Sequence, residues 1–162
     1  MNEGHWNQRQ RAIAQLRELG IQRELIYLID LVPLIEMIWA DGLRQDSELA
    51  LLEDFAARHV DRVNLQAGWE VLSHEDAKQF IARFVDERPD PNLLAKIRKG
   101  IRDIRLSNSD ERGNEALRAS ILASCLDIAS CSVVRYPYGP RERFDTAEKR
   151  CFFQILEDLA LA

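Results

Sequence analysis

Residues 34–57 read LIEMIWADGLRQDSELALLEDFAA, and their pattern decides the fold. The first part is apolar apart from one acid, Glu36, and it stops at Asp41-Gly42, where glycine favours the end of a helix. A second segment opens on Glu48 and carries apolar residues at the spacing of one helix face. The stretch therefore predicts two helices joined by a short turn.

The same order of features returns near the end of the chain. Residues 125–160 read CLDIASCSVVRYPYGPRERFDTAEKRCFFQILEDLA, again an apolar segment with one acid, a break and a new helix. Aligning Glu48 with Glu148 also aligns Leu52 with Phe152, so that apolar positions coincide as well. The duplication predicts a chain built from two related helical halves.

Helical spacing of apolar residues runs through nearly the whole chain, and no convincing segment alternates with a period of two. We therefore predict an all-α fold, a compact bundle of about seven helices built from two related halves. At 162 residues the chain is expected to form one domain, 1–162, with repeats at about 22–60 and 114–162. Pro33 is expected to kink or divide the helix that spans about 22–40, because proline lacks the amide that a helical turn needs.

The composition is that of an ordinary globular protein, with 46% hydrophobic residues, 30% charged residues and a net charge of −5. This negative charge argues against nucleic acid as a partner. Three cysteines without a CxxC spacing fit a reducing cytoplasm, and the polar N-terminal residues lack the apolar core of a signal peptide. The apolar run 25–40 is shorter than the roughly 20 residues of a membrane span, so it predicts a buried central helix.

The first break gathers acids that suit a hard cation. Asp41 and Glu48 flank the turn, Asp46 lies between them, and Glu36 precedes them on the apolar helix. Carboxylates together with the carbonyls of a helix end are typical ligands of Ca²⁺ or Mg²⁺ rather than Zn²⁺. Capping is the alternative, and spacing alone favours it, because acids in a first turn interact favourably with the helix dipole.

The second break carries a weaker version of this pattern. Asp145 and Glu148 are spaced as a capping box and form a second set of metal-ligand candidates. Ser132 stands where the first copy has Asp41, and the connection is longer in the second copy. If one cation site exists, it is expected at the first break.

Three acids, Asp30, Glu36 and Asp127, lie within apolar runs whose spacing predicts burial. A buried carboxylate is costly unless it is paired or bound to a metal, so each is expected to meet a nearby arginine or, alternatively, a metal ion. A metal-dependent hydrolase would need several such carboxylates to converge on one accessible pocket.

Other chemistry has little support. The sequence has no phosphate-binding glycine loop, no GxSxG, no HExxH and no zinc spacing of histidines, and its cysteines are expected to pack in the core. Arg98, Arg102 and Arg105 recur at helical spacing and are expected to form a solvated face opposite the apolar face of their helix. Enzyme function is therefore the weakest hypothesis.

The second connection contains Tyr136, Tyr138, Arg141 and Arg143, which are residue types favoured where proteins bind partners. Two interpretations stand side by side. The loop binds a partner, or it is a rigid surface excursion whose prolines limit its conformations.

The helix–Asp-Gly–turn–Glu–helix unit, used twice in a helical chain of this length, resembles the tellurite-resistance TerB-like family. That family is similar to the N-terminal domain of membrane-anchored DnaJ-like co-chaperones. The resemblance is best between residues 25 and 59, where Trp39-Ala-Asp-Gly42 is followed by Glu48. It implies a compact helical bundle of two halves, acids at the helix breaks as ligands of divalent cations, and a role in bacterial stress response near the inner membrane surface.

From this resemblance we expect a cytoplasmic, TerB-like adaptor that binds a divalent cation at the first break. It also implies protein partners and a peripheral association with the membrane. The alternative is a metal-free protein-interaction module that uses the 135–143 loop.

Overall fold

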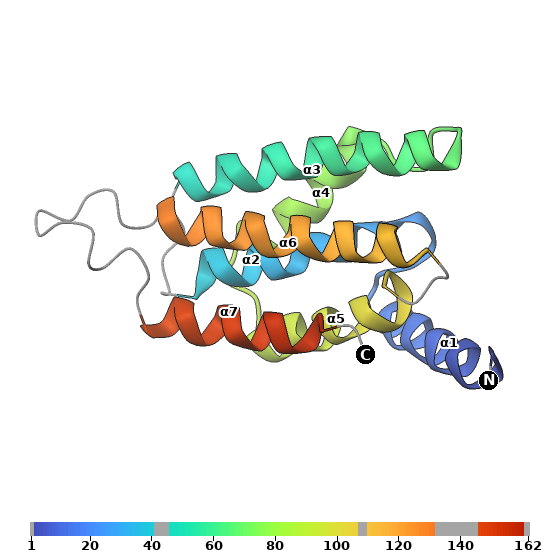
Figure 1. Ribbon diagram of the computed structural model, residues 1–162. Helices are drawn as coiled ribbons and strands as arrows, with labels where there is room; N and C mark the ends of the chain where they lie inside the picture. Colours follow the sequence, from blue (N-terminus) through green and yellow to red (C-terminus); the bar gives the residue numbers. More distant parts are fainter. Residues whose placement is uncertain (1, 41–45, 107–109, 132–145, 161–162) are drawn as a thin grey trace, which may run out of the picture.

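The computed structural model describes residues 2–40, 46–106, 110–131 and 146–160. Its elements in chain order are α1 (Asn2–Glu18), the 3₁₀ helix η1 (Arg23–Leu31), α2 (Val32–Trp39), α3 (Asp46–Ala67), α4 (His74–Val85), α5 (Pro91–Ile104), α6 (Glu111–Cys131) and α7 (Thr146–Asp158). Every regular element in the described ranges is a helix, which confirms the predicted all-α bundle (Figure 1).

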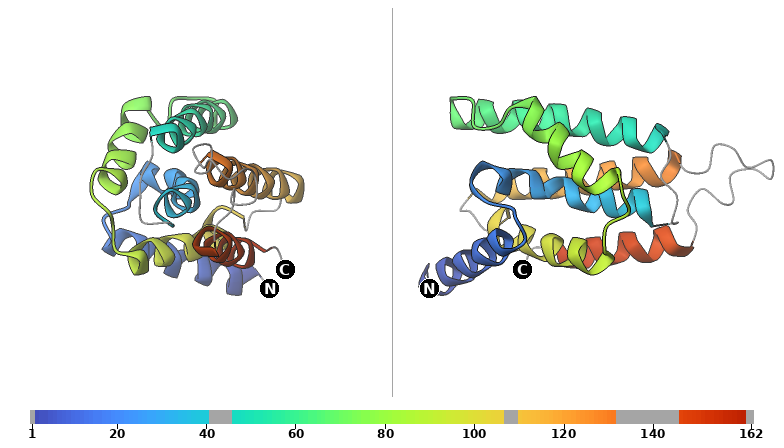
Figure 2. Two further views of the ribbon diagram at one scale, coloured as in Figure 1. Left: turned by 90° about the vertical axis from the view of Figure 1, so that its left-hand side faces the viewer. Right: turned by 180° about the vertical axis from the view of Figure 1, so that it is seen from behind.

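The segment formed by η1 and α2 lies at the centre of the bundle. Every residue from Leu28 to Ile38 is buried, and α2 contacts α3, α5, α6 and α7. Figure 2 shows these helices arranged around it. Full burial of a large aliphatic side chain contributes about 1.5–3 kcal/mol, so the buried aliphatic side chains of this segment make a large contribution to core stability. No helix among the described residues is long and apolar enough to cross a membrane.

Pro33 divides the central segment as predicted. It stands in the first turn of α2, where the amide that proline lacks would have no partner within the helix. The residues before it form a 3₁₀ helix instead of a continuous α-helix. The buried segment therefore changes its helical type beside the proline.

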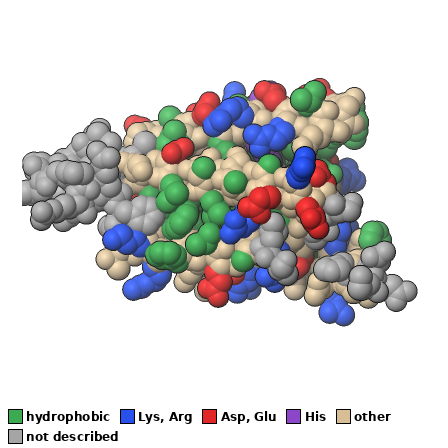
Figure 3. Space-filling model, in the orientation of Figure 1, with side chains coloured by type: hydrophobic (Ala, Val, Ile, Leu, Met, Phe, Trp, Pro, Cys, Tyr) green, Lys and Arg blue, Asp and Glu red, His purple; other side chains and the backbone are tan. Residues whose placement is uncertain are grey.

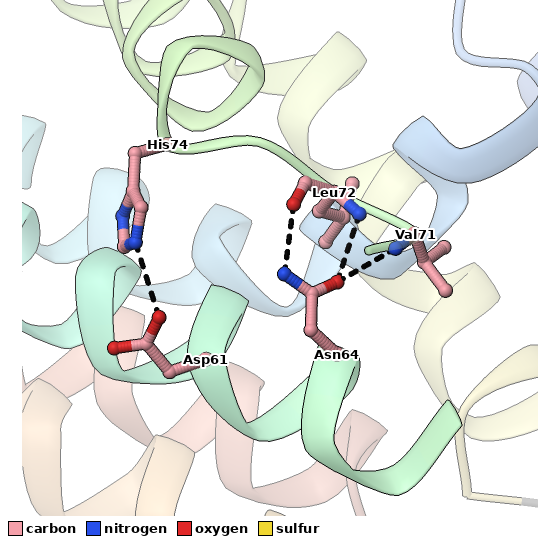
Figure 4. Close-up of polar contacts among 5 residues, drawn as sticks. All are labelled: Asp61, Asn64, Val71, Leu72 and His74. Atoms are coloured by element: carbon pink, nitrogen blue, oxygen red, sulfur yellow. Dashed lines mark hydrogen bonds and ion pairs between the residues drawn. The ribbon is translucent and has the colours of Figure 1, made fainter. Parts of the chain in front are cut away.

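The turn between α3 and α4 is held by Asn64. Its Oδ1 accepts hydrogen bonds from the amides of Val71 and Leu72 at 2.8 and 2.9 Å, and its Nδ2 donates to the Leu72 carbonyl at 2.8 Å (Figure 4). His74 Nε2 lies 3.1 Å from Asp61 Oδ1 and adds a second link. These contacts fix the direction in which α4 leaves α3.

The two predicted halves pack directly against each other. The first, α2 and α3, contacts the second, α6 and α7, through the pairs α2–α6, α2–α7 and α3–α6. The aligned residues Phe55 and Ile155 are both buried. The end of α2, the start of α3, the end of α6 and the start of α7 lie at one end of the bundle, on the left of Figure 1, which we call the break end.

Candidate functional site

Several predicted site residues lie outside the described residues. They are Asp41 at the first break and Tyr136, Tyr138, Arg141, Arg143 and Asp145 at the second. The metal and partner predictions made for these six positions stay predictions.

The remaining acids at the break end do not share one environment. Glu48 and Glu148 are each the third residue of their helices, α3 and α7, and both are almost completely buried. Asp46, in contrast, is exposed in the first turn of α3. The correspondence between Glu48 and Glu148 therefore extends from the sequence to their burial.

Glu36 is held in an ion pair that joins three helices. Its carboxylate accepts a hydrogen bond from Nη1 of Arg98, which comes from α5. Nε of Arg98 also donates to Oδ2 of Asp158 on α7 at 2.7 Å. Arg98 thus links α2 with α7 through α5, as was expected of an arginine paired with a buried Glu36.

The pKa of Glu36 reflects this environment. Burial is the main cause that raises it, the charge of Asp158 adds to the increase, and the Arg98 guanidinium opposes both, so that the pKa is about 7. A group that titrates near neutral pH beside an open cleft is of the kind found at functional sites.

A cleft of about 530 Å³ opens beside this pair. The end of α2, the connection before α5, the first half of α5 and the first half of α7 supply its walls. Its lining includes Glu36 and Arg98, the half-buried Trp39 and Cys151, and the exposed Lys99 and Arg150. We call it the break-end cleft. Its position was not predicted, because α5 contributes to it and carries none of the break motif.

The two thiols that the structure describes, Cys125 and Cys151, are not poised as nucleophiles. Burial raises the pKa of Cys151 to about 12, with the charge of Glu36 as a further cause, and burial also raises the pKa of Cys125 well above its usual value. Because these pKa values are raised, both thiols stay protonated near neutral pH. The reactive form of cysteine is the thiolate. Core packing, as predicted, describes the fully buried Cys125 well.

A second buried polar group surrounds Asp30 in η1. Its Oδ2 accepts a hydrogen bond from Arg105 Nε at 3.0 Å and lies 3.2 Å from His59 Nε2. His59 Nε2 also lies 2.8 Å from the Tyr27 carbonyl, and the Arg105 guanidinium stacks over the Tyr27 ring. Since Nε2 faces two oxygens, it carries the proton.

The pKa of Asp30 is lowered from its usual value. Burial alone would raise it, but the charge of Arg105 and the contacts with Arg105 and His59 outweigh burial. Asp30 is therefore ionised at neutral pH and contributes to stability as a paired carboxylate. A neighbouring cleft of about 450 Å³ between α3 and α6 is lined by His59 and Arg105 but not by Asp30.

Two sequence predictions about charged residues are wrong. Asp127 is exposed on α6, because its position faces away from the central segment. Arg98 and Arg105 do not form a solvated face with Arg102, since both turn inward to carboxylates and only Arg102 is exposed. The acids Asp30 and Glu36 required these inward arginines.

The buried His59 was missed by sequence reasoning. It follows Leu52 and Phe55 at helical spacing on the buried face of α3, and that periodicity could have placed it in the core. It stacks on Phe55 with ring centroids 5.7 Å apart.

The described residues do not by themselves build a metal site. Within these ranges, no group of three or more His, Cys, Asp or Glu side chains is placed to bind a metal ion. Glu36 is held by Arg98 and Asp46 is exposed, so neither joins Glu48 in a common ligand set.

Comparison with models of protein families, with curated proteins and with solved structures finds no match for this chain.

Proposed function

We propose that this protein is a non-catalytic, TerB-like binding module, an adaptor of the stress-response type, which binds a ligand in the break-end cleft. The observation that carries this proposal is the cleft itself, in which α2, α5 and α7 meet around the fixed Glu36–Arg98 pair. Its volume of about 530 Å³ lies within the range of small-ligand sites, roughly 300–1,000 Å³. The TerB-like assignment and the stress-related role rest on the resemblance around Trp39-Ala-Asp-Gly42 and Glu48.

Binding is favoured over catalysis because the reactive groups near the cleft are already engaged. Glu36 pairs with Arg98, and the thiol of Cys151 is protonated. Asp30 belongs to a separate cluster with Arg105, and Asp127 is exposed. The convergence of carboxylates that a hydrolase would need is therefore not supported by these three acids.

Filling the cleft tests the proposal. Ala147 lines the cleft and is exposed, so Ala147→Trp should occupy the space without disturbing the core. In a screen of small fragments followed by backbone amide NMR, we expect shifts in the end of α2 and the first halves of α5 and α7. Ala147→Trp should remove them, and Ala119→Trp, at an exposed position that does not line the cleft, should preserve them. Fragments that map elsewhere, or that bind Ala147→Trp equally well, would contradict the proposal.

A divalent cation at the break end is proposed as a second ligand. It is supported by the equivalent, buried positions of Glu48 and Glu148 beside the two connections, where Asp41 and Asp145 are the further candidates. Titration calorimetry with Ca²⁺, Mg²⁺, Mn²⁺ and Zn²⁺ should show binding that Asp41→Asn weakens and the exposed control Asp54→Asn does not. Absence of binding to the wild type, or equal binding by both variants, would exclude this site.

A protein partner is the other candidate, and the outer face of α6 and α7 favours it. Leu126 is 43% exposed and Phe153 62% exposed, and Figure 3 shows hydrophobic side chains gathered over these helices. The two helices precede and follow residues 132–145 in the sequence, which contain the predicted partner-binding loop.

Matched variants test this candidate. Leu126→Gln with Phe153→Gln, and separately deletion of 135–143, should abolish binding of a partner that the wild type retains. Leu65→Gln, at an 83% exposed position on α3, should leave binding intact. A partner bound equally by all variants would show that neither the face nor the loop is the interface.

A further inference from the structure

Basic side chains predominate over acidic ones among the described residues that line the break-end cleft. Arg88, Lys99 and Arg150 line it and are exposed, and none of them forms an ion pair within the part of the chain that the structure describes. The charge of Arg98 is already balanced by Glu36 and Asp158. In a chain of net charge −5, the described lining of the cleft carries these three cations, with Glu36 as its one carboxylate, and its charge is opposite in sign to that of the whole protein.

Two helices add to this positive charge. The first turns of α5 and α7 contribute Pro91, Asn92 and Ala147 to the lining. The start of a helix carries a partial positive charge, which favours a nearby anion. At α5 the Asp90 side chain already accepts from the Asn92 amide at 2.9 Å, so the cationic side chains remain the main source of attraction.

The cleft also offers apolar surface beside its cations. Trp39 is half-buried there, and its Nε1 donates to the Phe84 carbonyl at 2.9 Å, which holds the indole in place. Pro89 and Leu94 lie on the same lining. Isolated surface cations are ordinary solvated groups, but here they share the lining of a cleft of small-ligand size with a fixed aromatic ring.

We propose that the break-end cleft binds a small organic anion, a phosphate or carboxylate on an apolar body. The anionic group is bound by Lys99 and Arg150, with Arg88 adding to the attraction, and the apolar body packs on Trp39. This inference rests on the proposed function, because it names the ligand class of the same cleft. Arg98 keeps its ion pairs with Glu36 and Asp158 and does not bind the ligand; it fixes the helices that line the cleft.

The test uses three probes of similar size: phenyl phosphate, benzoate and benzyl alcohol. In titration calorimetry of the full chain at low salt, the anions should bind at least about tenfold more tightly than the neutral alcohol, since hydrogen bonds to charged groups contribute more than neutral ones. The affinity of the anions should fall as NaCl is raised, because salt screens exposed charges. The stronger of the two anions identifies phosphate or carboxylate as the natural group.

Matched variants on one helix locate the binding. Lys99→Gln should lower the affinity for phenyl phosphate by about fivefold, consistent with about 1 kcal/mol per partly exposed charge contact. The double variant Lys99→Gln with Arg150→Gln should lower it by more. Lys96→Gln, at an exposed position of α5 that does not line the cleft, should have no effect. Equal affinity for benzyl alcohol, or equal loss in Lys96→Gln and Lys99→Gln, would overturn the anion inference while the cleft stays a binding site. Failure of every probe, charged or neutral, would count against the proposed function itself.

Discussion

Asp30 is a buried charged residue whose removal should destabilise the fold strongly. Asp30→Ala would leave Arg105 and His59 without their shared carboxylate, and breaking such a buried pair costs about 3–5 kcal/mol. Urea denaturation of the variant measures this loss. The control Asp54→Ala removes an exposed pair with Arg58 and should change the free energy of unfolding by less than about 1 kcal/mol.

A double-variant cycle separates the pair from general damage to the core. If Asp30 and Arg105 act together, Asp30→Ala with Arg105→Ala should cost clearly less than the sum of the two single changes. Strict additivity would mean that their contact contributes nothing specific.

Glu36 should make the stability of the protein depend on pH. Its folded pKa of about 7 lies above its usual value of 4.5, so between these values the folded protein holds a proton that the unfolded chain has lost. The free energy of unfolding therefore falls as pH rises from about 4.5 to 7, by no more than about 3 kcal/mol at roughly 1.4 kcal/mol per pKa unit.

The neutral isostere isolates this effect. The difference in unfolding free energy between wild type and Glu36→Gln should shift against the wild type between pH 5 and pH 8, a window in which Asp30 stays ionised because its pKa is lowered. A difference that is constant with pH would show that Arg98 keeps Glu36 ionised throughout.

At the level of single residues, the sequence predicted that buried acids would pair with arginines better than it predicted which way individual side chains point. The apolar surroundings of Asp30 and Glu36 correctly indicated buried carboxylates that need arginines. They could not indicate which arginines, because Arg98 and Arg105 lie more than 60 residues away in the chain and reach the acids only when α5 packs on η1 and α2. Asp127 sits in a similar apolar run, but α6 exposes that side to solvent.

The capping box of α4 should stabilise that helix measurably. Ser73 Oγ accepts from the Asp76 amide at 3.0 Å, and the Ser73 amide donates to Asp76 Oδ2 at 3.0 Å. Ser73→Ala should lower the free energy of unfolding by about 1 kcal/mol. Ser130→Ala, an exposed position inside α6, should be neutral or slightly stabilising because alanine is the better helix former. If the two changes alter the free energy of unfolding equally, the cap does not stabilise the helix.

Helices were predictable as elements, and their ends were less so. Pro33 marks the division of the central segment, and the capping pattern Ser73-His-Glu-Asp76 predicts a helix start where the structure has the start of α4. The end of α3 was harder. Apolar periodicity predicts an end near His59, but the helix continues to Ala67 and stops at Gly68, whose φ of +78° favours glycine. The last turns of α3 are largely exposed to solvent, so their sequence has no apolar periodicity from which the end of the helix could be predicted.

At the scale of the whole molecule, the repeat organises the framework but not the site. Glu48 and Glu148 are buried alike, as are Phe55 and Ile155, and the two halves share the centre of the bundle. Placing Asp41 opposite Ser132 aligns Glu36 with Asp127, and Glu36 has no buried counterpart because Asp127 is exposed. The break-end cleft also needs α5, which lies between the halves in the sequence, so the motif alone could not predict it.

The central claim is that the break-end cleft is the binding site of this protein. A crystal structure grown with phenyl phosphate tests it most directly. The account predicts the phenyl ring against Trp39 and the phosphate within hydrogen-bond distance of Lys99 or Arg150. Phenyl phosphate bound only outside the cleft, or an unoccupied cleft under conditions in which calorimetry shows binding, would contradict it.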